Sequence, residues 1–150
     1  MFLIVRVFVL FIFFVIILYE VYGFMSELRG ELHHYNEIIM KTYPKDIYIM
    51  GWNNFIRMSD LTQGKVKPDN ILSGHVAYSV FGDKLRNIFS RFFYEKYIQI
   101  TLSKKEKLNI YFSTKIYSNG IQGIDAASVF FFKKKLGKLS KDELILLFKK

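Results

Sequence analysis

The first hydrophobic pattern along the chain is an almost unbroken apolar run from Phe2 to Tyr19, interrupted by Arg6. A helix needs about twenty apolar residues to cross the hydrocarbon core of a bilayer. Arg6 lies near enough to one end of the run to extend its charge toward the headgroups. We therefore expect residues 1–23 to form a transmembrane anchor. The alternative is a cleaved signal peptide, for which Val21-Tyr22-Gly23 offers only a poor cleavage site.

The charges beside this run favour one orientation in a membrane. Arg6 makes its leading end positive, whereas glutamates follow it at Glu20, Glu27 and Glu31. Positive residues next to a membrane span tend to stay in the cytoplasm. We expect a single-pass protein of the cytoplasmic membrane whose body lies on the outer side, periplasmic or extracellular.

Residues 24–43 mix polar and apolar positions at helical spacing, which predicts a stalk helix that continues the anchor until Pro44 ends it. The adjacent His33 and His34 are candidate metal ligands. Neighbouring residues on a helix point about 100° apart, and no third ligand lies at a suitable spacing. We interpret the pair as solvated and expect neither a metal nor another cofactor.

The body, residues 44–150, is expected to be mainly helical. The alternation at Asp46–Met50 is typical of a short strand or a buried turn, and Asp60–Asn70 has the composition of a turn-rich linker. Apolar positions then recur every three and four residues in 71–81 and 84–102, which predicts two amphipathic helices. The second helix carries a largely aromatic stripe that we interpret as core: Leu85, Ile88, Phe89, Phe92, Phe93 and Ile98.

Two helix-start signals stand in the last third of the chain. Ser103 precedes Glu106 by three residues, and Ser140 precedes Glu143 in the same way. In this spacing the serine oxygen accepts a hydrogen bond from an early helical N–H while the glutamate accepts one from the serine N–H. A helix is therefore expected to begin after each serine.

A glycine-containing turn is expected between these two helices, at Ser118–Gly123. Its asparagine and two glycines tolerate a positive φ, so the turn can feed a third helix at Ile124–Phe132. The small side chains of Ala126 and Ala127 are expected to let this helix approach the one containing Tyr111.

Composition and net charge limit the classes of partner that the chain can have. The 150 residues are 51% apolar and 18% aromatic, enough for one modest packed domain beside a membrane segment, and the absence of cysteine excludes disulfides and thiolate zinc sites. The net charge of +9 indicates an anionic partner, although any single lysine cluster can be a solvated face. For a membrane-tethered chain the natural partners are anionic lipid or a lipid-linked pyrophosphate, and Phe130–Phe132 beside Lys133–Lys135 is a candidate for dipping into the interface. No nucleic-acid partner is expected for a body outside the cytoplasm.

The last third also carries a longer pattern of residues in a single register. It consists of Tyr111, Ile116, Tyr117, Gly120, Gly123, Ile124, Ala126, Ala127, Phe131, Phe132, Lys134, Leu139 and Glu143. This pattern resembles the peptidoglycan glycosyltransferases of family 51, the transglycosylases found alone or as the first domain of class A penicillin-binding proteins. The resemblance implies a small lysozyme-like helical lobe, a role in peptidoglycan biosynthesis, and a lipid-linked peptidoglycan precursor and other cell-wall synthesis proteins as partners.

The same register extends upstream without gaps, so that the resemblance covers about half of the chain. Residues 103–113 lie on the family's SKxEILExYLN helix, residues 90–100 on the helix that carries its RKxxE motif, and residues 71–81 near its TITQQLAKNLF segment. The TQQ positions hold Ser73, Gly74 and His75.

The departures from the family concern its catalytic carboxylates. Family members use a glutamate in an early EDxxFxxH motif as the base that activates the acceptor hydroxyl. The nearest segment here places Gly51 at that glutamate and Met58 at the histidine, and the RKxxE positions hold Asn87, Ile88 and Arg91. The asparagine of YLN is replaced by Ser113.

A permanently charged arginine is neither an acid nor a base near neutral pH, so this register implies a retained scaffold without its chemistry. The only carboxylates close in register are Glu95, one turn past Arg91, and Glu106. No catalytic residue is assigned. Three functions remain open: a catalytically degenerate binding or scaffold protein of cell-wall assembly, an active peptidoglycan glycosyltransferase, and an unrelated small membrane protein.

Overall fold

The structure is a computed structural model that describes residues 2–63 and 67–150, with side chains for residues 6–57 and 67–150. These residues form eight α-helices and three short 3₁₀ helices, with one isolated antiparallel bridge between Ile116 and Gln122 and no strand in the described part. The prediction of a mainly helical protein is confirmed. The chain divides into two compact units, residues 1–35 and residues 36–150.

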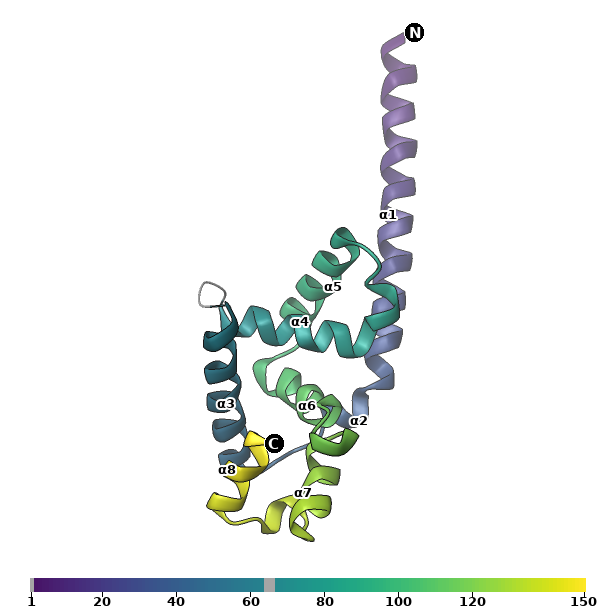
Figure 1. Ribbon diagram of the computed structural model, residues 1–150. Coiled ribbons are helices and arrows are strands. Elements are labelled where there is room, and N and C mark those ends of the chain that lie inside the picture. Colours follow the sequence, from purple (N-terminus) through teal and green to yellow (C-terminus); the bar gives the residue numbers. More distant parts are fainter. Residues whose placement is uncertain (1, 64–66) are drawn as a thin grey trace. The chain divides into compact units, whose positions relative to one another are not determined.

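The first unit is one helix, α1 (Phe2–His34) (Figure 1). Its segment Arg6–His34 is long and apolar enough to cross a membrane, as expected from the hydrophobic run. The helix continues without a break through Gly23 and Gly30, so the predicted anchor and most of the predicted stalk belong to the same element.

The second unit begins with α2 (Asn36–Ile39) and α3 (Lys45–Gln63). The prediction of a strand or buried turn at Asp46–Met50 is wrong, because these residues form the start of α3. Pro44 initiates the helix, its carbonyl accepting a hydrogen bond from the Ile47 N–H at 3.0 Å. The inward positions Ile47, Gly51 and Phe55 recur every four residues and are buried, which is a helical period rather than a strand period.

The helices α4 (Pro68–Phe81) and α5 (Ile88–Thr101) follow, joined through the 3₁₀ helix Gly82–Lys84. The linker predicted at Asp60–Asn70 is shorter than expected. Its first residues belong to α3 and its last to α4, while residues 64–66 lie outside the described part. Proline is favoured at the first position of a helix, so Pro68 starts α4 instead of marking a loop.

The start of the fifth helix also differs from the sequence prediction of residues 84–102. Asn87 caps α5, its side-chain oxygen accepting a hydrogen bond from the Ser90 N–H at 2.8 Å, so Lys84 and Leu85 precede the helix. Of the predicted aromatic stripe, Ile98 is buried, but Ile88, Phe89, Phe92 and Phe93 are exposed. The interpretation of this stripe as core is therefore wrong.

The last third contains α6 (Lys104–Thr114), α7 (Ile124–Phe132) and α8 (Lys141–Lys149), with 3₁₀ helices at Ser118–Gly120 and Leu136–Lys138. Both predicted capping boxes are present. The Glu106 N–H donates to the Ser103 hydroxyl and the Glu143 N–H to the Ser140 hydroxyl, at 3.3 and 3.2 Å. The helix starts predicted from these two signals are confirmed.

The predicted glycine turn is confirmed as well. Asn119, Gly120 and Gly123 have φ values of 66°, 72° and 86°, in the region that glycine and asparagine tolerate best. A side chain on Gly123 would place its Cβ 3.0 Å from the Ser113 carbonyl oxygen, so α7 can start close to α6 only with glycine here. Ala127 is buried as expected, whereas Ala126 is exposed, so only one of the two alanines packs inward.

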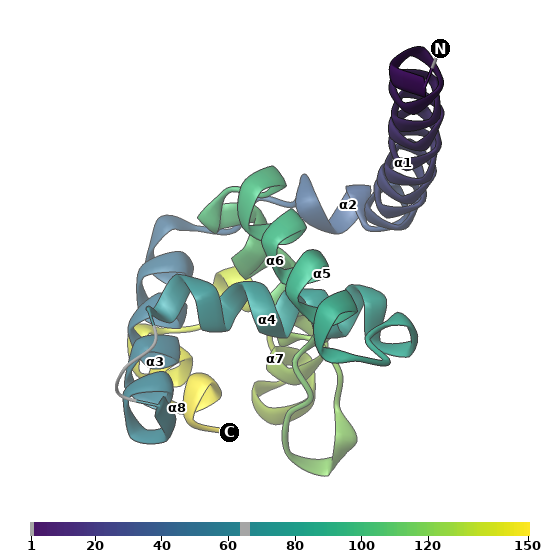
Figure 2. The same cartoon turned by 90° about the horizontal axis from the view of Figure 1, so that it is seen from above.

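The core of the second unit is built around α4, which packs against α3, α5 and α6 (Figures 1 and 2). Fully buried apolar side chains come from several of these helices: Leu72, Val76, Ala77, Phe81, Ile98, Ile110 and Phe112. The main packing contacts of α5 are with α4, while α8 packs on α3 and α7.

Candidate functional site

A groove of about 820 Å³, lined by both polar and apolar side chains, lies between α4 and α5. The described residues that give it its chemistry come from both helices: Gly74, His75 and Tyr78 from α4, and Arg91, Glu95 and Lys96 from α5. Two motif positions of the resemblance, Gly74-His75 and Arg91, thus meet in one groove. Because these positions are far apart in the sequence, their meeting depends on the packing of α5 on α4.

An arginine–glutamate pair lines the groove. Arg91 Nε donates to Glu95 Oε1 at 2.8 Å, four residues along the same helix. A Cβ on Gly74 would lie 3.2 Å from this carboxylate oxygen, so the glycine leaves room for Glu95 beside α4. The carboxylate is held by a cation, and the Arg91 side chain remains 67% exposed.

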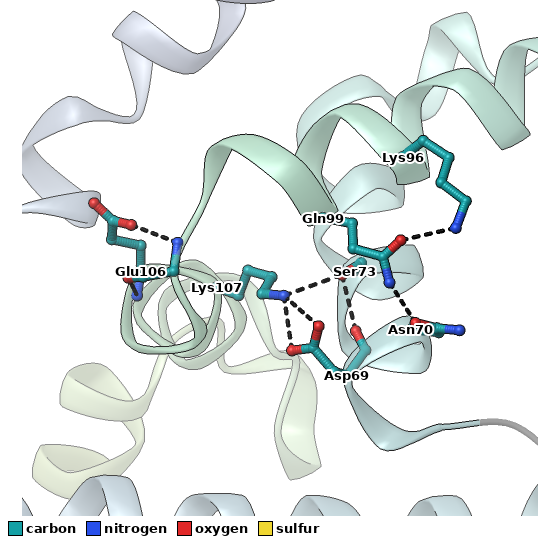
Figure 3. Close-up of polar contacts among 8 residues, drawn as sticks. Asp69, Asn70, Ser73, Lys96, Gln99, Glu106 and Lys107 are labelled. Carbon is teal, nitrogen blue, oxygen red and sulfur yellow. Dashed lines mark hydrogen bonds and ion pairs between the residues drawn. The ribbon is translucent and has the colours of Figure 1, made fainter.

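A chain of hydrogen bonds joins Lys96 of α5 to Asn70 of α4 through Gln99 (Figure 3). Lys96 Nζ donates to Gln99 Oε1 at 2.8 Å, and the Gln99 amide donates to the side chain of Asn70. These contacts hold the Lys96 ammonium beside the groove and add a second cation to that of Arg91.

His75 lies where the groove meets an aromatic cluster. Its ring is edge-on to the rings of Phe55 and Tyr111, at centroid distances of 5.9 and 6.0 Å. Burial lowers the pKa of His75 and raises that of Tyr111, so both side chains are neutral near pH 7. His75, which lines the groove, can offer a hydrogen bond to a ligand without adding charge.

Other predicted site residues lie elsewhere. Gly51 is buried under aromatic rings, where a Cβ would come within 2.3 Å of Phe112 Cζ. Glu106 is engaged in its capping box, accepting a hydrogen bond from the Ser103 N–H at 2.6 Å (Figure 3). The Met58 side chain lies outside the described residues.

The remaining motif positions have structural roles or face solvent. Asn87 caps α5, Ile88 is exposed, and the Ser113 carbonyl lies against Gly123. Within the described residues no group of three potential metal ligands forms, and the ring of His34 stands edge-on to that of Tyr35 at 5.9 Å.

Lys107 belongs to a lysine cluster at the start of α6 whose side chains were expected to be solvated, and for Lys107 this expectation is wrong. Its side chain is 3% exposed and its ammonium lies 2.7 Å from each carboxylate oxygen of Asp69 and 3.3 Å from the Ser73 hydroxyl (Figure 3). The ion pair joins α6 to α4. One sequence signal could have indicated its burial. In the match of residues 103–113 to the motif SKxEILExYLN, Lys107 replaces an isoleucine.

A second polar cluster lies beside the glycine turn, next to a cavity of about 440 Å³. Asp125, two residues after Gly123, pairs with Lys41 and accepts a hydrogen bond from the Tyr43 hydroxyl at 3.1 Å. Burial, together with the charge of Asp125, raises the pKa of Tyr43. This carboxylate does face a cavity, but it is engaged by two donors.

The residues around Lys41 are held in place by a buried amide. The Asn109 side chain donates to the Ile39 and Lys41 carbonyls at 3.0 and 2.6 Å and accepts from the Tyr48 hydroxyl at 2.7 Å. A glutamate stands at this position in the SKxEILExYLN motif and could not donate these bonds when ionised. Asn109 therefore fixes the segment between α2 and α3 on α6.

The fold and the groove define a helical protein with an apolar N-terminal helix and a polar groove containing two cations. Two curated relatives, from Haemophilus influenzae strains PittEE and Rd, are both named biosynthetic peptidoglycan transglycosylase. Each is 42% identical to the chain over 50 residues, which is 33% of this chain and 21% or 20% of the relative. The chain thus spans about a fifth of the length of these relatives. No family model matches the chain, and no solved structure matches it.

Proposed function

We propose that this chain is a transglycosylase-like protein of cell-wall assembly, a degenerate or partial member of glycosyltransferase family 51. In this proposal it binds a lipid-linked peptidoglycan precursor and does not polymerise it. The observation that carries the proposal is the 42% identity, over 50 residues, to two proteins named biosynthetic peptidoglycan transglycosylase.

The groove between α4 and α5 supports a binding role. A pyrophosphate carries several negative charges, and Arg91 and Lys96 both line this groove. Arginine can form bidentate hydrogen bonds with a phosphate, whereas lysine acts as a point charge. Neutral hydrogen-bonding groups on His75 and Tyr78 lie in the same groove and suit the hydroxyl groups of a sugar.

The occupants of the motif positions argue against polymerisation. Glycosyl transfer needs a base for the attacking hydroxyl and a cation or metal on the leaving pyrophosphate. The groove supplies the cations. Gly51 stands where the resembled family has its catalytic base, and it is buried against Phe112. Arg91 stands where that family has its second glutamate.

An active transglycosylase is the second candidate because one carboxylate does line the groove. Glu95 lies one turn past Arg91 and is bonded to it at 2.8 Å. The Arg91 Nε–H donates to Oε1 of this carboxylate, so that oxygen is already engaged within α5. This favours a structural role for Glu95 and keeps it as the residue to test.

We further propose that α1 anchors the protein in the cytoplasmic membrane with the second unit on the outer side. The apolar length of α1 supports the anchor, and the charges around it support the orientation. A reporter enzyme fused after Lys150 should be active on the outer side, and activity confined to the cytoplasm would contradict the orientation.

A polymerisation assay tests the main proposal. The full chain in detergent, incubated with radiolabelled lipid-linked disaccharide, should give no glycan polymer on a gel under conditions in which an active transglycosylase does. Turnover that disappears in Glu95→Gln but persists in Glu106→Gln would refute the proposal and identify Glu95 as the base. Glu106→Gln is the matched control because this glutamate caps α6 instead of lining the groove.

A further inference from the structure

The cavity beside the glycine turn, which we call the α7 cavity, lies apart from the groove between α4 and α5. Its walls are the segment 41–44 between α2 and α3, Asp125 and Val129 of α7, and the turn at residues 135–137. Among the described residues, the cavity and the groove share no lining side chain. Its volume of about 440 Å³ is in the range of small-molecule sites.

One oxygen of the Asp125 carboxylate is available to a ligand. The Lys41 ammonium and the Tyr43 hydroxyl both donate to Oδ2, the hydroxyl at 3.1 Å. No donor among the described residues reaches Oδ1, and the Asp125 side chain is 49% exposed. An ionised carboxylate oxygen is an acceptor only, so Asp125 can still bind an ammonium group.

Lys135 brings the opposite charge to the same cavity. Its side chain is exposed, and within the described part of the chain it forms no ion pair or hydrogen bond. Lys135 and Asp125 therefore line one cavity without contacting each other. Two opposite charges in this arrangement can be bridged by a ligand that carries both.

Buried side chains fix the walls on which these charges stand. The Ser128 hydroxyl lies 2.9 Å from the carbonyl oxygen of Asp125 and 3.0 Å from that of Lys134, so it joins the start of α7 to the turn that follows the helix. The Asn109 amide holds the Lys41 carbonyl on the other wall. Both Ser128 and Asn109 are 0% exposed. A site that is formed before the ligand arrives loses less conformational entropy on binding.

Apolar side chains line the rest of the cavity: Pro44, Val129 and Leu136. Leu136 is buried in the core, whereas Val129 is 51% exposed. A ligand side chain that covered Val129 would remove apolar surface from water, which is favourable. The cavity therefore suits a ligand with an apolar group beside its two charges.

We propose that the α7 cavity binds a small zwitterion with an apolar side chain, either a free α-amino acid or a short peptide with both ends free. The ligand ammonium donates to Asp125 Oδ1, the ligand carboxylate accepts from Lys135, and the apolar side chain covers Val129. The proposal does not depend on the proposed function, because the cavity is separate from the groove.

Ligand-observed NMR on the full chain in detergent tests which charges the cavity requires, with protein-free micelles as the background. The probes are L-leucine and L-leucyl-L-leucine, whose chain is longer by one Cα–Cα step of about 3.8 Å. Each is compared with its N-acetylated form, which lacks the ammonium, and its amidated form, which lacks the carboxylate.

At least one of the two zwitterions should bind. Removal of either charge from that ligand should weaken its binding by about threefold or more, as expected for a partly exposed ion pair. The zwitterion that binds more tightly identifies the source, since stronger binding of leucine indicates a free amino acid and stronger binding of the dipeptide indicates peptide ends.

A protein variant assigns the carboxylate contact. Lys135→Gln should weaken binding of the zwitterion by a similar factor and leave binding of the amidated form unchanged. This variant removes an exposed side chain that has no partner among the described residues, so the fold should be retained. Lys138→Gln is the matched control, because Lys138 is exposed in the same turn and does not line the cavity.

Three results would overturn the proposal. The first is the absence of binding by both zwitterions at millimolar concentration. The second is equal binding of a zwitterion and its two singly charged forms, which would show that only the apolar side chain is recognised. The third is equal weakening by Lys135→Gln and Lys138→Gln.

Discussion

At the scale of single residues, two glycines decide what the neighbouring side chains can do. Gly74 leaves room for the Glu95 carboxylate beside α4, and Gly51 leaves room for the Phe112 ring against α3. The first keeps a charged group in the groove. The second removes from the groove the position that a catalytic base would hold in the resembled family, because Gly51 faces the core.

The packing at Gly51 can be tested with one methyl group. Gly51→Ala would place Cβ within 2.3 Å of Phe112 Cζ and 3.2 Å of Phe148 Cε1, and overpacking of this kind costs about 1–3 kcal/mol. Gly137→Ala is the control, because nothing lies within 4 Å of its Cβ position. Chemical unfolding should show a loss for Gly51→Ala and little change for Gly137→Ala. Equal stabilities would contradict the buried placement of Gly51.

At the scale of elements, the buried ion pair between Lys107 and Asp69 joins α6 to α4. The Lys107 side chain is 3% exposed and that of Asp69 41%. Both oxygens of Asp69 and the Ser73 hydroxyl surround the ammonium, so its desolvation is compensated. Removing one partner would leave a buried charge without its counterion.

Asp69→Asn should therefore lower the free energy of unfolding by about 3 kcal/mol. Asp46→Asn is the matched control, since Asp46 also lies in the first turn of a helix and shares only the favourable effect of an acidic group there. Lys107→Met removes the charge together with the need for a counterion and should be much less destabilising. If Asp69→Asn and Asp46→Asn unfold at the same denaturant concentration, the ion pair does not hold α4 to α6.

The elements that the sequence predicted well depend on local chemistry. The capping boxes at Ser103 and Ser140 depend only on side chains that accept hydrogen bonds from nearby N–H groups. The turn at Asn119–Gly123 depends only on residues that tolerate a positive φ. Both can therefore be predicted without knowledge of the tertiary contacts. The prediction of a strand or buried turn at Asp46–Met50 was wrong because a short alternation of apolar and polar residues also fits the start of a helix. The inward positions of that helix are Ile47 and Gly51.

The exposed and buried faces could not be predicted in the same way. On α5 both Phe92 and Ile98 lie in apolar rows of helical spacing, and only the packing on α4 decides that Ile98 is buried while Phe92 is exposed. The groove was partly predictable, since the register named Arg91 and His75. The ring neighbours of His75, Phe55 and Tyr111, come from α3 and α6. The register named Tyr111, but no local sequence signal indicates that the three rings meet.

At the scale of the whole molecule, the protein combines an apolar helix, a cation-containing groove and a partial likeness to transglycosylases. In the proposed function the groove binds a lipid-linked pyrophosphate without using it as a glycosyl donor. Arg91 and Lys96 should then supply much of the affinity. A basic side chain near an anionic membrane surface contributes about 1 kcal/mol, and we expect a similar contribution from each of these cations toward the pyrophosphate. Salt should weaken the binding, because both side chains are partly open to solvent.

The most direct measurement is equilibrium binding of fluorescent lipid-linked disaccharide pyrophosphate to the full chain in detergent, with polymer analysed in the same samples. The double variant Arg91→Gln/Lys96→Gln loses two cations, about 2 kcal/mol together, and should bind about thirtyfold more weakly than the unaltered chain. Lys138→Gln/Lys149→Gln, which loses the same charge away from the groove, should retain its affinity, and no sample should contain polymer. Equal weakening in both double variants, or glycan polymer made by the unaltered chain, would contradict the account.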